Sequence, residues 1–193
     1  MIASWLALTL CIALRWIASG TIPMSNGYET MLLMAWIIEL VAIVMTPRIR
    51  IMLTFGFLTS GLFLLVSHIG QMNPQITHIM PVLNSPLLSI HVSVIMLAYA
   101  LLSLTFACGV TALVMKKRAE YLQKLSMLFL HPSITALGIG IFTGSIWANI
   151  SWGTYWSWDP KEVWALITFM VYAGAVHSQS LPSLRKPGTY HLY

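Results

Sequence analysis

The residues of this chain that could do chemistry are histidines and a dense group of tryptophans. The 193 residues include 6 histidines and 8 tryptophans. Most of the tryptophans fall in one stretch, namely Trp147, Trp152, Trp156, Trp158 and Trp164. Neutral imidazole is a good ligand for metals, haem iron included, and indole rings present broad apolar faces. The clustering predicts a platform that receives something flat and apolar.

A tryptophan belt at a membrane surface is the alternative explanation for this cluster. A belt would spread aromatic side chains over every outer helix end, whereas the other outer connections contain almost none. Composition alone leaves the platform and the belt both open.

The histidines fall at different depths of the predicted helices. His91 lies near the outer end of a long apolar segment, whereas His177 follows Pro160 by about 26 Å of helix, near the inner end. Both are candidate iron ligands, and hydration or a backbone hydrogen bond is the alternative for each. Hydration is the simpler explanation for His68 and His78, which are predicted to lie in a polar connection.

The stretch from Asp159 to Glu162 has the pattern of a helix start. Asp159 is the predicted N-cap, Pro160 the first helical residue and Glu162 the third, as in a capping box. His131, which precedes a proline, is also interpreted as a helix-start feature. Helix initiation explains the aspartate and the proline of the first pattern, but it does not explain the rings beside them.

Charged residues inside or beside the apolar segments need partners, because unpaired charges in a bilayer are costly. Arg15 and Glu29 are predicted at similar depth, and Glu29 also completes a capping pattern that begins at Asn26. We expect these two charges to neutralise each other; the alternative is that Arg15 or Lys161 pairs with an anionic ligand group. Glu39 lies well inside its segment, which indicates either a functional site or a buried hydrogen bond within the bundle.

The composition is that of an all-α polytopic membrane protein. The chain is 58% hydrophobic and 8% charged, against roughly 25% charged residues in soluble domains. Apolar runs of about 18 residues or more indicate transmembrane helices. We predict about six of them in a single integral-membrane domain covering residues 1–193, at approximately 2–18, 30–46, 51–67, 86–115, 127–150 and 160–177.

Several classes of function are disfavoured by the sequence. Cys11 and Cys108 lie in apolar runs outside any CxxC or CxxCH pattern, so they predict neither a thiol redox pair nor a covalent haem motif. No basic patch is interleaved with aromatic residues, so a nucleic-acid partner is not expected.

The final residues, TYHLY, resemble the start of another span. We therefore expect the chain to be a fragment that lacks at least one C-terminal helix.

Lysine and arginine gather in connections that fall on one side of the predicted topology. They are Arg48, Arg50, Lys116, Lys117, Arg118, Lys124, Arg185 and Lys186. The positive-inside rule makes that side cytoplasmic, so the tryptophan-rich connection is expected to face outward.

The stretch WGTYWSWDPKEVWALITFMVYAGAVH, residues 152–177, resembles the tryptophan-rich WWD segment of the cytochrome c assembly family. Within that family it is similar to the CcsA (ResC) branch of the System II pathway. LRWIASGTIPMSNGYETM resembles the early outer loop of that branch, and SPLLSIHVSVIMLAYALL resembles its histidine-bearing helix. The stretches occur in the family's order and cover nearly the whole chain.

The resemblance implies a membrane protein that binds haem b on an outward-facing WWD surface and delivers it to apocytochrome c. The positions that carry over to this surface are Trp152, Trp156, Trp158 and Asp159. His91 matches the outer axial-ligand histidine, and His177 matches a histidine within the membrane at a second haem position. The family has a further outer histidine after one more span, and no residue of this sequence corresponds to it.

The same resemblance implies partners and a location. It points to a membrane partner of the CcsB (ResB) type, a CxxCH-containing apocytochrome c, and the bacterial cytoplasmic membrane, with the WWD loop facing the periplasm or cell exterior. The chain would be a haem-export subunit of a holocytochrome c synthase (haem lyase), with no catalytic residue assigned. The alternatives are a membrane b-type electron-transfer subunit, which needs histidines at matched depth, and a small-solute transporter, which the clustered tryptophans disfavour.

Overall fold

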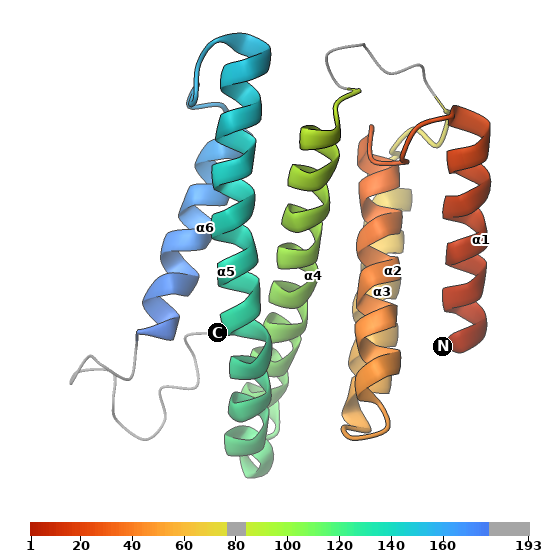
Figure 1. The fold of residues 1–193 in the computed structure, drawn as a ribbon. Coiled ribbons are helices and arrows are strands. Elements are labelled where there is room, and N and C mark those ends of the chain that lie inside the picture. Colours follow the sequence, from red (N-terminus) through yellow and green to blue (C-terminus); the bar gives the residue numbers. More distant parts are fainter. Residues whose placement is uncertain (77–83, 178–193) are drawn as a thin grey trace. The chain divides into compact units, whose positions relative to one another are not determined.

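The computed structural model describes residues 1–76 and 84–177, and all regular structure in these residues is helical (Figure 1). The elements are α1 (Ile2–Ser19), α2 (Gly27–Met45), α3 (Ile51–Ile69), α4 (Pro86–Val114), the short 3₁₀ helix η2 (Lys116–Arg118), α5 (Ala119–Trp152) and α6 (Pro160–Val176). The predicted all-α class is therefore confirmed. The predictions that concern His78, Arg185, Lys186 and the final TYHLY lie outside the described residues.

The helices have the character of membrane-spanning segments. Helices α1 to α5 are long and apolar enough to cross a membrane, and α6 has 17 residues. Large apolar side chains point away from the protein along these helices, for example Leu6, Leu10, Leu14 and Phe142. Such exposure suits hydrocarbon better than water, so the chain is a multi-pass membrane protein.

Helix α5 begins earlier than the sequence predicted. The expected start near residue 127 and the helix-start interpretation of His131 are wrong, because the helix runs from Ala119 and contains Pro132 in its interior. Its 34 residues span about 51 Å, against about 30 Å of hydrocarbon. A buried face at helical spacing explains the added turns; it comprises Ala119, Leu122, Leu125 and Ser126. Membrane helices tolerate an internal proline where neighbouring groups satisfy the freed carbonyl.

The chain forms two compact units, Met1–Ala100 and Leu101–Tyr193, with the boundary inside α4. In the first unit α1 packs on α2, and α2 packs on α3. The α2–α3 contact is close, because a Cβ atom added to Gly56 would overlap the Cβ of Ala42. The same interface contains Glu39, which is only 3% exposed. Whether residues 1–193 act as a single domain stays a prediction.

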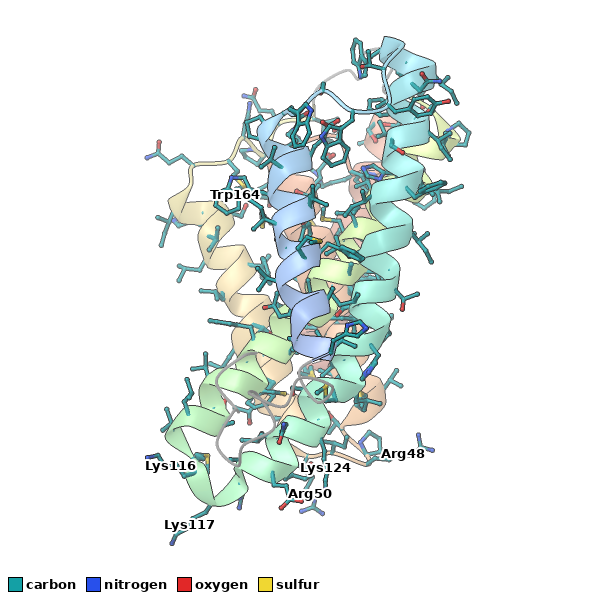
Figure 2. All side chains as sticks on the ribbon, turned by 90° about the vertical axis from the view of Figure 1, so that its left-hand side faces the viewer. Arg48, Arg50, Lys116, Lys117, Lys124 and Trp164 are labelled. Carbon is teal, nitrogen blue, oxygen red and sulfur yellow. The ribbon has the colours of Figure 1, made fainter. Side chains whose placement is uncertain are left out.

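In the second unit α5 and α6 run side by side in opposite directions, joined by residues 153–159. They approach closely at Gly138, where an added Cβ would lie 3.2 Å from the Cε2 atom of Phe169. Figure 2 shows Lys116, Lys117 and Lys124 at one end of this unit and Trp164 toward its other end. The tryptophan-rich connection thus lies at the end of α5 opposite to its lysines.

Candidate functional site

The start of α6 is a complete capping box. The Asp159 side chain accepts a hydrogen bond from the backbone N–H of Glu162 at 2.9 Å (Oδ1). The Glu162 side chain accepts in return from the backbone N–H of Asp159, at 3.4 Å. Pro160 occupies the first turn, where its missing N–H costs nothing. The predicted helix start is confirmed at each of these positions.

The same glutamate also holds the connection that precedes the helix. Glu162 Oε2 accepts from the backbone N–H of Ser157 at 2.8 Å and lies 3.3 Å from its hydroxyl. Between these two residues Trp158 has φ +60°, in the left-handed region that tryptophan rarely adopts. Gly153, at φ +77°, ends α5 in the same region, where glycine is unstrained. The capping box therefore extends into the loop and fixes a backbone turn at Trp158.

Two indole rings at this connection are exposed although they are large and apolar, whereas that of Trp156 is half-buried. Trp152 is 61% exposed and Trp158 is 71% exposed. Trp156 and Trp158 form an edge-to-face pair with ring centroids 5.9 Å apart, and Trp147 and Trp152 form another at 6.3 Å. Edge-to-face pairs are favourable arrangements of aromatic rings. They limit how the rings can turn while leaving apolar area uncovered.

Trp147 extends the cluster into α5. Its indole N–H is buried and has no acceptor among the described residues. Trp147 belongs to the tryptophan-rich stretch of the sequence, but no role was predicted for it. Its edge-to-face contact with Trp152 lies within the last turns of α5. Spacing alone did not indicate this contact, because the usual neighbours on a helix surface are three or four positions apart rather than five.

His177 lies at the opposite end of α6, as its position in the sequence predicted. It caps the C-terminal end of that helix, and its Nδ1 is 2.8 Å from the carbonyl oxygen of Ala173. A carbonyl only accepts, so Nδ1 carries the proton and Nε2 of the neutral ring has a free lone pair. His131 has the same arrangement on α5, with Nδ1 2.8 Å from Met127 O. A backbone carbonyl on Nδ1 is the usual support for a histidine that binds a metal through Nε2.

His91 lies in the first turns of α4 and is half-buried. The helix starts as the sequence predicted, with the Ser85 hydroxyl accepting from the backbone N–H of Leu88 at 3.1 Å. His91 belongs to the first compact unit, and the tryptophan connection and His177 belong to the second. The structure thus groups Trp152, Trp156, Trp158 and Asp159 locally, while the meeting of His91 with this group stays a prediction. Among the described residues, no group of three or more histidine, cysteine, aspartate and glutamate side chains could hold a metal ion.

In the first unit Arg15 and Glu29 pair as the sequence suggested, and the structure supplies partners for Glu39, for which the sequence had suggested none. Arg15 Nη2 lies 3.0 Å from Glu29 Oε1, and the Asn26 side chain caps α2 by accepting from the Glu29 N–H at 2.9 Å. Glu39 accepts from the Ser4 hydroxyl at 2.9 Å and from the Ser60 hydroxyl at 3.1 Å. Of the two interpretations of Glu39, the buried hydrogen bond within the bundle is therefore confirmed.

Comparison with known proteins gives consistent matches along nearly the full sequence. The family described as cytochrome C assembly protein matches residues 24–191. Protein NrfI of Wolinella succinogenes is 36% identical over 184 residues, which cover 90% of this chain and 20% of that protein. The cytochrome c biogenesis protein CcsA of Guillardia theta is 32% identical over 213 residues, covering 92% of this chain and 70% of that protein.

A third relative is matched over about half of its own length. The CcsA protein of Chlamydomonas reinhardtii is 31% identical over 192 residues, covering 90% of this chain and 54% of that protein. The chain thus spans one fifth of NrfI and between 54% and 70% of these two CcsA proteins.

Proposed function

Because the chain belongs to the cytochrome c assembly protein family, we propose that it binds haem b at the outer face of the membrane and delivers it to apocytochrome c. The observation that carries the proposal is a group of indole rings, paired edge to face, at the end of α5 and in its connection to α6, in which Trp152 and Trp158 are largely exposed. Function in cytochrome c biogenesis also follows from the relatives named CcsA.

The residues of this connection fit a flat apolar ligand. Haem is a broad disc, and the exposed faces of Trp152 and Trp158 offer it apolar area without first opening a core. The capping box holds the loop in place, since the Glu162 carboxylate accepts hydrogen bonds from the backbone N–H groups of both Ser157 and Asp159. A platform of this kind is more specific than an interfacial belt, because a belt needs no fixed loop backbone.

Two histidines are proposed as axial ligands of haem iron at separate positions. His91, in the first turns of α4, is the proposed ligand at the outer haem position. His177 serves a position at the opposite end of α6, where its Nδ1–H···O=C bond to Ala173 leaves Nε2 as the ligand atom. Asp159 contributes to the proposed haem surface by capping the start of α6, directly after Trp158. When bound, haem supplies the vinyl groups for attachment, and the cysteine thiols come from the apocytochrome.

The proposed location is the bacterial cytoplasmic membrane, with the tryptophan connection facing the periplasm or cell exterior. In the second unit the lysine end of α5 is opposite to that connection (Figure 2). In the first unit Arg48 and Arg50 border the α2–α3 turn, at the end of α2 opposite to Glu29. Each unit by itself therefore has the charge distribution that the positive-inside rule associates with one orientation.

The proposed partners are a CcsB (ResB)-like membrane protein and the apocytochrome c that receives the haem. Together with the partner, the chain would form a holocytochrome c synthase. Its own residues bind and orient; no catalytic side chain is assigned to it. The described cysteines fit this division, because Cys108 is buried in α4 and Cys11 is half-buried in α1.

The test uses purified protein from a strain that depends on it for cytochrome c. We expect His91→Ala to reduce the haem absorbance per protein and the yield of holocytochrome c. Trp156→Ala should reduce the same yield without preventing membrane insertion. His68→Ala is the matched control, since His68 is an exposed histidine at the end of α3 with no assigned role. An unchanged haem spectrum and full assembly in His91→Ala would refute the ligand assignment, and normal assembly in Trp156→Ala would refute the platform.

A further inference from the structure

We infer that the buried Arg15–Glu29 pair is a positioning hub for the outer part of α4, the helix segment that carries His91. The inference rests on the proposed function for the role of His91. It adds residues of α1 and α2 that lie far from the tryptophan connection in sequence and that have no ligand role of their own.

The pair itself is almost removed from solvent. The side chains of Arg15 and Glu29 are 12% and 3% exposed. Both Nε and Nη2 of the guanidinium donate to Glu29 Oε1, at 3.3 and 3.0 Å. The guanidinium carbon also lies 5.1 Å from the ring centroid of Tyr28, a cation–π distance. Since each charge is desolvated, each depends on the other, and the pair has one strongly preferred geometry.

A first arm runs from the carboxylate to α4. Glu29 Oε2 accepts from both the backbone N–H and the hydroxyl of Ser25, at 2.9 and 2.7 Å. These two hydrogen bonds from one residue fix the loop between α1 and α2. The neighbouring residue in that loop, Met24, lies with its sulfur 3.5 Å from the Ser93 hydroxyl. Ser93 is two positions after His91 on the same helix, so the loop held by Glu29 rests directly on the His91 segment.

A second arm runs from the guanidinium to the connection that precedes α4. Arg15 Nη1 donates to the carbonyl oxygen of Pro74 at 2.8 Å. Close by in sequence, the sulfur of Met72 would lie 3.3 Å from a Cβ added to Gly27, so this connection also packs on the first turn of α2. One guanidinium therefore ties α1, α2 and the α3–α4 connection together, using all three of its nitrogen atoms as donors.

The geometry has a functional consequence because axial ligation tolerates little displacement. The iron ligand must keep both its distance and its ring orientation, and a small shift of the supporting helix changes both. If the hub is broken, the Met24 contact and the Pro74 contact are released together. The outer segment of α4 then loses its contact with Met24, and the chain before residue 77 loses its bond at Pro74, while α4 itself remains helical.

The main variant is Glu29→Gln, which keeps the shape of the side chain and removes its charge. We expect haem retained at the outer site to fall about 2- to 30-fold, the range found for side chains that act on a site at a distance. Arg15→Lys keeps the charge but cannot reach Glu29 and Pro74 together, so it should show a smaller loss. Glu120→Gln is the matched control, because its pair with Lys124 is exposed (76% for both side chains) and should leave haem unchanged.

Two readouts separate positioning from general damage. The double variant Glu29→Gln with His91→Gly should retain no less haem than His91→Gly alone, because both changes act on one ligand. Imidazole added to the Glu29→Gln protein should restore the haem spectrum, since a free ligand does not depend on where α4 lies. A protein that has lost its fold would not be restored.

The outcomes distinguish the hub from the proposed function. Haem loss in His91→Gly but full retention in Glu29→Gln overturns the hub and leaves the function standing. Full retention in His91→Gly overturns the ligand assignment itself. Additive losses in the double variant, or a Glu29→Gln loss that imidazole does not restore, overturn the positioning role and assign Glu29 to folding alone.

Discussion

Replacing Asp159 by asparagine and by alanine separates its role as the cap of α6 from a role of its negative charge. Asp159 caps α6 through one bond, from the Glu162 N–H to Oδ1 at 2.9 Å. Asparagine has the same acceptor atom and is an equally good N-cap, whereas alanine has none. If the cap is what matters, the asparagine variant should retain haem like the parent protein and the alanine variant should retain less.

The size of the effect follows from the bonds that remain. In Asp159→Ala the backbone N–H of residue 159 and that of Ser157 still bind the Glu162 carboxylate. Only the cap bond is lost, which costs typically about 1 kcal/mol, with a range of about 0.5–2. At 25 °C a cost of about 1 kcal/mol lowers the ratio of fixed to released loop about fivefold. We expect haem retention to fall by a similar factor, with the helix content unchanged.

The assay is the haem absorbance per purified protein together with the yield of holocytochrome c, with helix content followed by circular dichroism. Equal losses in Asp159→Asn and Asp159→Ala would refute the cap as the main role and assign the effect to the loss of the negative charge. Full retention in Asp159→Ala would show that the capping box does not hold the platform.

Two further predictions concern the first unit: the close packing at Gly56 and the role of the Glu39 carboxylate. Gly56→Ala should lower the stability of the purified protein by about 1–3 kcal/mol in a thermal melt, because the new methyl group would overlap Ala42. Gly61→Ala on the same helix meets no atom within 4 Å and should be neutral or stabilising by up to about 1 kcal/mol; equal losses at both positions would contradict the close-contact argument. Glu39→Gln should support normal cytochrome c assembly, since an amide can still accept from Ser60. A stable Glu39→Gln protein without activity would mean that the carboxylate takes part in proton transfer.

The features that sequence predicted correctly are local or depend only on depth. The caps at Asn26, Ser85 and Asp159 join residues three positions apart, so the helix start itself brings donor and acceptor together. The pairing of Arg15 with Glu29 followed from their similar depth, because an apolar surrounding leaves a charge few other partners. The multi-pass helical class followed from the length of the apolar runs.

The start of α5 was misplaced because the prediction used hydrophobicity alone. The segment before residue 127 contains Glu120 and Lys124, which are exposed and paired with each other. A helical spacing of apolar residues was present there and would have indicated the longer helix.

Sequence by itself determined which residues are available: a tryptophan cluster, the caps that begin the helices, and charges that must pair. Only the tertiary structure decided how they are combined. It set Ser4 and Ser60 against Glu39, and Pro74 against Arg15. The physical reason is that a helix cap is closed by bonds within one turn of chain. Contacts between segments depend instead on which faces of the helices meet, and apolar faces that suit either lipid or protein do not specify this in advance.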